Sequence, residues 1–191
     1  MKKLMIGVGL LIATTQVTVA QQHVAFGVKG GLNIAKFTKE NDAEFKFKPS
    51  VHLGVLAHIH INKSFAIQPE LVFSAQGSKY TVNNTDFRNN LNYINLPVLF
   101  QLMTSNGFRF ETGPQAGVLV SAKSKTGNTT TDAKDDFKST DLAWAFGVGY
   151  IAASRLGFDV RYNMGLSDVT KSTESNFKNS VIQAGIFYQF K

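Results

Sequence analysis

The final segment of the chain alternates strictly between apolar and mixed residues, and this pattern constrains the fold more than any other feature. One face would carry Ile182, Ala184, Ile186, Tyr188 and Phe190, and the other would carry Val181, Gln183, Gly185, Phe187 and Gln189. A period of two predicts a β-strand with one apolar face. A strand at the edge of a sheet exposes unpaired backbone groups, whereas a sheet closed into a barrel has no edge. The pattern therefore predicts that this strand closes a barrel.

Seven further segments show the same alternation and predict seven more strands. They lie near residues 24–35, 51–61, 65–80, 91–103, 108–120, 141–151 and 156–164. The predicted connections alternate between long polar stretches, at 36–50, 81–90, 121–140 and 167–178, and tight turns at 62–64, 104–107 and 152–154. Even strand number with alternating long and short connections is typical of outer-membrane barrels. We therefore predict an all-β fold, an eight-stranded antiparallel up-and-down transmembrane β-barrel.

The two faces of the predicted strands differ in composition, and this difference indicates which face is outside. One face holds nearly every large aliphatic and aromatic residue, while the other is rich in Gly, Ala, Gln and charged residues. Eight strands leave an interior just wide enough for side chains, which small and polar residues fill best. The composition favours a membrane barrel. The alternative is a soluble, periplasmic, lipocalin-like ligand-binding barrel, whose apolar face would point inward.

The first twenty residues differ from the rest and predict a signal peptide. Lys2 and Lys3 precede an apolar run over residues 4–13, and small residues follow at 18–20. A basic start, a short apolar run and a small-residue cleavage site are typical of secretory signals. We therefore expect a signal peptide at 1–20 and a β-barrel domain at 21–191.

The charges of the chain are scattered rather than clustered. The formal net charge is +7, and the sequence contains no cysteine. Without a dense basic stretch we predict no nucleic-acid partner. A secreted domain without disulfides has to rely on its own strand pairing and packing for stability.

Several short motifs resemble one family. Tyr93-Ile-Asn-Leu-Pro97-Val-Leu and Gly113-Pro-Gln-Ala-Gly117 are similar to signatures of the small outer-membrane β-barrel proteins often labelled "porin family" or "outer membrane protein beta-barrel domain". Phe146-Gly-Val-Gly-Tyr150 and the segment 161–169 resemble its later strands. The resemblance implies a Gram-negative cell envelope, location in the outer membrane and contact with outer-membrane lipid.

The end of the chain carries a further resemblance. Gln183, Gly185, Tyr188 and Phe190 are spaced as in the closing signal that the barrel-assembly machinery reads, although Lys191 follows the final aromatic. The resemblance implies that machinery as a partner, with these four residues as the assembly signal.

Six charged residues are predicted to face the interior of the barrel. Three are cations and three are acids: Lys29, Arg109, Arg161, Glu70, Glu111 and Asp159. Buried charges need partners, because an isolated ion in a protein interior costs several kcal/mol. We hypothesise a structural salt-bridge network that fills the lumen. The alternative is that some of these residues lie at the solvated rims.

Three histidines, His52, His58 and His60, share one face of a predicted strand. Such spacing could serve a metal, but a polar lumen explains the residues without one. We predict no metal site and no cofactor. The predicted loops contain no histidine to join an acid and a serine, so we also predict that the protein is not an enzyme.

The predicted long loops are the remaining candidates for recognition. Residues 121–140, and the stretch around Phe45 and Phe47, would face outward, where loops on a rigid scaffold commonly bind partners. Passive, solvated loops are the alternative. We predict a structural or surface-interaction protein with a side-chain-filled lumen and an extracellular ligand bound through the loops. A narrow pore for small solutes is the other membrane alternative.

Overall fold

The computed structural model describes residues 24–39, 47–82, 85–127, 129–171 and 177–190. The predicted signal peptide at 1–20 and Phe45 lie outside the described residues. Within the described part of the chain, no helix has the length and apolar character needed to cross a bilayer.

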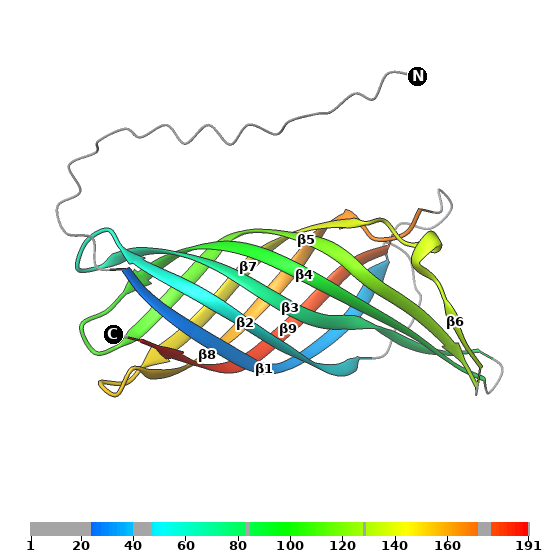
Figure 1. Ribbon diagram of the computed structural model, residues 1–191, viewed down its shortest axis with the longest axis horizontal. Helices are drawn as coiled ribbons and strands as arrows, with labels where there is room; N and C mark the ends of the chain where they lie inside the picture. Colours follow the sequence, from blue (N-terminus) through cyan, green and yellow to red (C-terminus); the bar gives the residue numbers. More distant parts are fainter. Residues whose placement is uncertain (1–23, 40–46, 83–84, 128, 172–176, 191) are drawn as a thin grey trace, which may run out of the picture.

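Eight antiparallel strands close into a tilted barrel (Figure 1). They are β1 (Val24–Lys39), β2 (Lys48–His60), β3 (Phe65–Val82), β4 (Thr85–Met103), β5 (Phe108–Thr126), β7 (Thr140–Ile151), β8 (Leu156–Asp168) and β9 (Phe177–Gln189). The short β6 (Thr129–Asp132) pairs with β5 outside the ring. Closure occurs where β9 pairs with β1, for example at Val28 opposite Tyr188. The predicted eight-stranded antiparallel barrel is therefore confirmed, including closure by the final strand.

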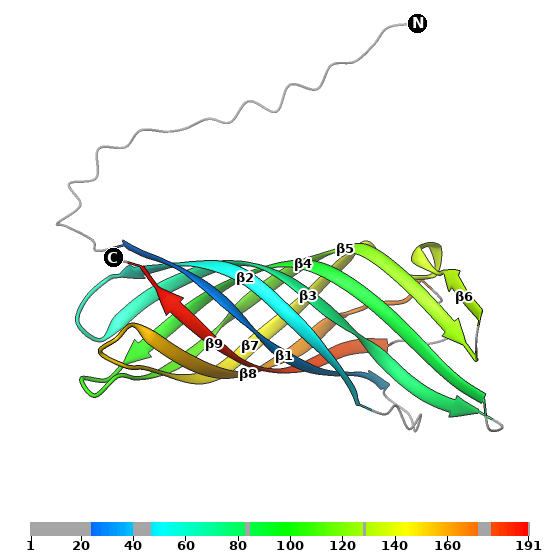
Figure 2. The same ribbon diagram turned by 60° about the horizontal axis from the view of Figure 1, so that its bottom comes forward.

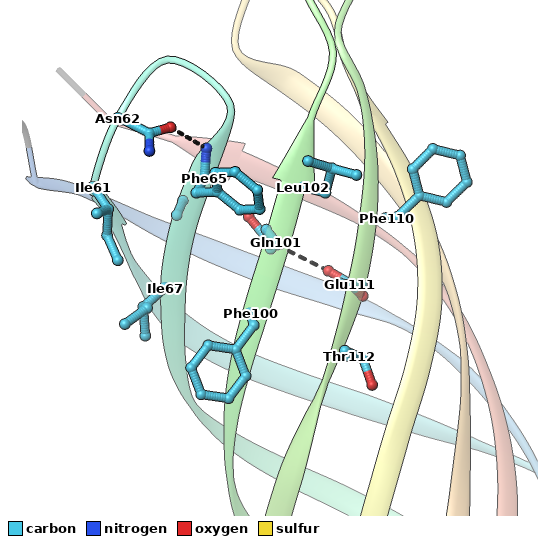
Figure 3. Close-up of a pocket in the computed structure, with 11 residues that line it drawn as sticks. Ile61, Asn62, Phe65, Ile67, Phe100, Gln101, Leu102, Phe110, Glu111 and Thr112 are labelled. Carbon is cyan, nitrogen blue, oxygen red and sulfur yellow. Dashed lines mark hydrogen bonds between the residues drawn. The ribbon is translucent and has the colours of Figure 1, made fainter.

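The apolar face of the strands points outward, as the composition predicted. Phe26 and Leu53 are 64% and 68% exposed, whereas Glu70 and Arg161 on the inner face are 2% and 1% exposed. Figure 3 shows one apolar groove on the outer face, where the rings of Phe100 and Phe110 point away from the barrel. A continuous exposed apolar surface of this kind suits lipid and not water. The arrangement does not favour the soluble alternative.

Three tight turns lie at one end of the barrel, which we call the short-turn end. They span residues 61–64, 104–107 and 152–155, and the described chain begins and ends nearby (Figure 2). In the first turn the Asn62 side-chain oxygen accepts hydrogen bonds from the backbone N–H groups of Ser64 and Phe65. Gly107 has a φ of 93°, which a residue with a side chain rarely adopts. The opposite end, which carries the longer connections, is the long-loop end.

Two predicted loops are instead extended strands, and these predictions were wrong. In the described parts of 81–90, β3 continues to Val82 and β4 begins at Thr85, and these two residues lie opposite each other. Over residues 121–140, β5 continues to Thr126 and pairs with β6, and a 3₁₀ turn follows at Lys134–Asp136. Here the strands project past the apolar surface, so both faces are polar and the alternation that identifies a strand is lost.

All four prolines lie in barrel strands: Pro49 is the second residue of β2, and the other three lie in or beside a gap in a pairing ladder. The β2–β3 ladder is interrupted beside Pro69, between Leu56–Glu70 and Ile59–Ile67. The β4–β5 ladder is interrupted between Pro97–Gln115 and Phe100–Thr112, a gap that includes Pro114. Proline has no N–H to donate, so it is tolerated where the ladder is already open.

Candidate functional site: the lumen of the barrel

Arg161 lies at the centre of the lumen and joins two acids from different strands. Its Nη1 and Nη2 donate to the two carboxylate oxygens of Glu70, each at 3.0 Å. Its Nε donates to Oε1 of Glu111 at 2.9 Å. A bidentate arginine–carboxylate pair is among the strongest charge-assisted hydrogen bonds in proteins. One side chain on β8 thus connects β3 and β5 across the barrel.

Lys29 extends this group to a third acid. Its Nζ lies 3.0 Å from Oδ2 of Asp159 and 3.3 Å from Oε2 of Glu70. Gln68 donates to Glu70 at 2.8 Å, and Gln101 donates to Glu111 at 2.9 Å, so amide side chains satisfy remaining carboxylate lone pairs. We call Lys29, Glu70, Glu111, Asp159 and Arg161 the ion network.

Arg109, the sixth predicted member, does not join the ion network. It is 4% exposed, yet its Nε and Nη1 have no hydrogen-bond partner among the described residues. Its guanidinium instead lies over the ring of Phe187, 5.0 Å from the centroid. The structure therefore places all six predicted charges inside the barrel but connects only five of them.

A layer of neutral polar side chains lies beside the ion network. Asn33 is its centre: its Oδ1 bonds to Nδ1 of His52 at 2.8 Å and accepts from Gln183 at 3.0 Å, and its Nδ2 donates to Ser74 at 2.9 Å. Gln76 continues the layer by donating to Ser74 at 3.0 Å. These bonds fix amide and imidazole groups that would be costly to bury alone.

The long-loop end of the lumen is filled by a cluster of apolar side chains, which we call the apolar cap. It comprises Phe37, Leu91, Tyr93, Leu119, Ala122, Ala133, Phe137 and Val169, with Phe177 packed against it. The Phe37 ring lies 6.3 Å from that of Phe137 and 6.2 Å from that of Phe177. Strands and loops contribute together, so the cap seals this end of the barrel.

Backbone hydrogen bonds hold residues 133–139, which we call the cap segment, in place. Ala133 donates to the carbonyl of Ala122 at 3.1 Å, and Lys138 donates to that of Val169 at 2.8 Å. The view of residues 121–140 as an outward, solvated loop therefore needs correction, since Ala133 and Phe137 are 5% and 6% exposed. The segment folds back because its two apolar residues can be buried only at the mouth of the barrel.

The short-turn end of the lumen is open by contrast. A cavity of about 250 Å³ lies there, lined by His58, His60, Lys63, Met103, Thr104, Gly107, Phe108, Arg109, Ile151 and Gln189. We call it the basic cavity, because the described residues of its lining include an arginine, a lysine and two histidines but no acid.

The three histidines do not converge on one point. His52 is bonded to Asn33 in the polar layer, while His58 bonds to Gln68 at 3.2 Å and its ring lies 4.4 Å from that of His60. Amide side chains, rather than carboxylates, orient the rings of His52 and His58.

The residues of the predicted assembly signal divide between the two faces of β9. Gln183 lies inside and donates to Asn33, and Gly185 packs closely against His52. Tyr188 and Phe190 point outward, 42% and 45% exposed, and their rings lie 5.6 Å apart.

Sequence reasoning missed the apolar cap and the basic cavity. The only sequence signal of the cap is the occurrence of lone apolar residues, such as Phe137, within polar stretches. The basic cavity has no local signal, because it joins residues from three turns and several strands. Phe187, which Arg109 contacts, was recognised only as an aromatic residue on the mixed face.

Comparison with known proteins agrees with this architecture. Residues 19–171 match the family described as "Outer membrane protein beta-barrel domain". No curated protein matches the sequence.

Two of the solved structures that are similar in fold illustrate the likeness. Neisserial surface protein A (NspA) has a TM-score of 0.58 and 17% identity, over 88% of this chain and 99% of that one. The attachment invasion locus protein Ail of Yersinia pestis, in complex with the heparin analogue sucrose octasulfate, has a TM-score of 0.53 and 13% identity, over 88% and 99%.

Proposed function

The chain belongs to the outer membrane protein beta-barrel domain family and is located in the outer membrane, and we propose that it acts as a closed, non-conducting barrel. In this class the short turns face the periplasm and the longer connections face outside the cell. The observation that carries the proposal is the apolar cap, which fills the extracellular mouth of the lumen. The barrel would then serve as a rigid support for an extracellular surface.

The cap and the ion network form two successive barriers. A solute that entered from outside would first have to displace Phe37 and Phe137, which pack against each other. It would then meet Arg161, whose guanidinium is held by two acids. Eight strands leave little more room than these side chains occupy. These features favour a sealed lumen over a narrow pore.

Conductance across a planar bilayer tests the proposal. The wild-type protein should give no discrete current steps, while a double variant, Phe137→Ala with Arg161→Ala, should give measurable current. As a control, protease digestion of the long-loop end in the same membranes shows that the protein is inserted. An absence of current then cannot be explained by an absence of protein. Discrete steps from the wild type would establish the narrow pore instead.

A row of cations on the extracellular strands favours a second, compatible role. Lys79 on β3 lies directly opposite Arg88 on β4, which lies directly opposite Lys125 on β5. Three cations at directly paired positions bring positive charge together on one part of the sheet, and such a surface attracts a polyanion. We propose that this cationic row binds a sulfated or phosphorylated polymer at the cell surface.

The structure of Ail with sucrose octasulfate offers a probe for this role. Titration of the purified protein with sucrose octasulfate should show binding that weakens as salt is raised. A double variant, Arg88→Gln with Lys125→Gln, should weaken it. The matched control, Lys134→Gln with Arg155→Gln, removes one lysine and one arginine that lie outside both the row and the basic cavity, and it should bind as the wild type does. Equal losses of affinity in the two double variants would show that the net charge of the protein, and not the cationic row, is responsible for binding.

We propose a non-catalytic role for the lumen. His52 and His58 face the amide side chains of Asn33 and Gln68, an arrangement that provides no activated nucleophile.

We also propose that the assembly machinery recognises β9 through Gln183, Gly185, Tyr188 and Phe190, and that the outer face contacts outer-membrane lipid. The exposure of Tyr188 and Phe190 on that face supports both contacts. Replacing Phe190 with Ser should lower the fraction of protein that shows a heat-sensitive gel shift in cells, whereas Leu156→Ser, a similar change on the neighbouring strand, should lower it less.

A further inference from the structure

Arg109 is the one arginine of the lumen whose charge the barrel does not satisfy through hydrogen bonds. Its Nε and Nη1 have no partner among the described residues, although the side chain is only 4% exposed. Burying a guanidinium without partners is costly, because the charge loses its hydration. Such an arrangement persists when something outside the chain supplies the missing hydrogen bonds.

The nearby acids form no hydrogen bond with Nε or Nη1 of Arg109, although Oδ1 of Asp159 also lacks a partner among the described residues. Glu111 and Asp159 are the two whose charges act on Arg109. The oxygens of Glu111 accept from Arg161 and Gln101, and Oδ2 of Asp159 accepts from Lys29. Arg109 therefore faces the basic cavity rather than the ion network.

The guanidinium of Arg109 packs against an aromatic ring. Its Cζ atom lies over Phe187, 5.0 Å from the ring centroid. The ring fits there because Gly157 has no side chain: a Cβ at that position would lie 2.2 Å from Cζ of Phe187. A guanidinium stacked on an aromatic ring keeps its N–H edge free for an oxyanion with two acceptor oxygens.

The remaining lining of the basic cavity adds positive charge and hydrogen-bond donors. Lys63 contributes an ammonium from the β2–β3 turn, and His58, His60 and Gln189 contribute polar groups. Among the described residues, none of those that line the cavity is acidic. Its volume of about 250 Å³ is below the ~300–1,000 Å³ of sites for drug-sized ligands, so it suits a small group.

We propose that the basic cavity is a binding site for a phosphate group that enters from the periplasmic side, with Arg109 as its principal ligand. Phosphate presents several acceptor oxygens and a full negative charge, which match a guanidinium edge supported by Lys63. The phosphate can belong to a small solute of the periplasm or to the headgroup of an inner-leaflet phospholipid. Both sources share the same recognition chemistry.

The first arm of the test uses inorganic phosphate and the full-length mature protein folded in maltoside micelles, which contain no phosphate. Calorimetric titration should show saturable binding to the wild type. Arg109→Gln should weaken it by about tenfold or more, since one charge-assisted contact is worth about that factor. Lys63→Gln should weaken it by a smaller factor, about twofold to fivefold, because a lysine supplies a single point charge.

Arg155→Gln is the matched control, because it removes one arginine charge from the same end without touching the cavity lining. Its affinity should equal that of the wild type. The heat-sensitive gel shift verifies that each variant is folded. If Arg109→Gln does not fold, the Lys63→Gln titration still decides, since Lys63 lies in an exposed turn.

The second arm tests the lipid source. Wild-type protein reconstituted in vesicles of equal parts phosphatidylethanolamine and phosphatidylglycerol is extracted and examined by native mass spectrometry. Retention of a phospholipid that Arg109→Gln loses and Arg155→Gln keeps would identify a headgroup as the ligand. Phosphate binding in micelles without such retention would identify a solute. The proposal would be overturned if the wild type neither bound phosphate nor retained a phospholipid. It would also be overturned if Arg109→Gln left both phosphate binding and phospholipid retention unchanged. In either case water would be the partner of Arg109.

Discussion

At the long-loop end the lumen is filled by the apolar cap, whereas at the short-turn end it opens into a cavity of about 250 Å³ around Arg109. Contacts between apolar side chains that exclude water hold the cap together, and only the hydroxyl of Tyr93 lacks a hydrogen-bond partner among its described side chains. In the basic cavity the unpartnered atoms are charged, because Nε and Nη1 of Arg109 have no hydrogen-bond partner among the described residues. The ion network lies between them. The difference shows that the two ends of one lumen differ in chemistry: apolar packing fills one end, and basic side chains line an open cavity at the other.

The largest expected effect contrasts the two buried arginines of the lumen. Arg161→Gln leaves Glu70 and Glu111 buried without their shared cation, and loss of one partner from a buried pair costs about 3–5 kcal/mol. Arg109→Gln should cost less than about 1 kcal/mol, because no hydrogen bond is lost. Urea unfolding in micelles measures both. Similar costs would mean that Arg109 belongs to the same structural network.

The second effect tests whether the cap is a packed core. Phe137→Ala should cost about 3 kcal/mol, at the lower edge of values for buried phenylalanine because the cap lies at the end of the barrel. Hydrogen exchange at residues 133–139 should speed up. Phe47→Ala is the control, since Phe47 is 54% exposed on the same side. Unchanged exchange in Phe137→Ala would show that backbone bonds alone hold the cap segment.

The third effect tests the space that glycine leaves beside the basic cavity. Gly157→Ala would place a Cβ 2.2 Å from Phe187 Cζ and 2.6 Å from the Tyr150 carbonyl oxygen. The overpacking should cost about 1–2 kcal/mol and displace the ring beneath Arg109. Gly149→Ala should cost less, because its nearest atom lies at 3.0 Å. Unfolding midpoints compare the two, and an equal or reversed order would contradict the packing described.

The smallest effect concerns the cationic row outside the cell. Lys125→Gln should stabilise the barrel by about 0.2–0.5 kcal/mol, because it removes a like charge opposite Arg88. The gain should disappear at high salt. Lys134→Gln, on the exposed 3₁₀ turn away from the row, should leave stability unchanged. A loss of stability in Lys125→Gln would show that the row is compensated by other groups.

Much of the barrel could be predicted from the sequence, because alternate residues of a membrane-spanning strand face lipid and lumen and differ in polarity accordingly. The strand from Leu156, with Phe158 outside and Asp159 inside, follows this rule without exception up to Leu166. Beyond the apolar surface the rule fails. Residues 81–82 and 85–90 form paired strands although their sequence predicts no apolar face, since backbone hydrogen bonds need no particular side chain.

The sequence also placed six charges in the lumen but could not pair them. The alternation of residues along each strand assigns both Arg109 and Arg161 to the inward face. The sequence alone therefore does not distinguish their environments. The strand tilt and register set Arg161 between Glu70 and Glu111, and they set Arg109 on Phe187. Partners that are 91 and 50 residues from Arg161 in the chain become neighbours only through closure of the sheet.

The sequence by itself determined the barrel, its inward and outward faces and the chemical character of its lumen, because alternation and composition act locally along each strand. Only the tertiary structure decided that one mouth is sealed by apolar residues and the other left basic and open. That division depends on which side chains meet across the barrel, and this is fixed by register, tilt and the folding back of the segment that carries Phe137.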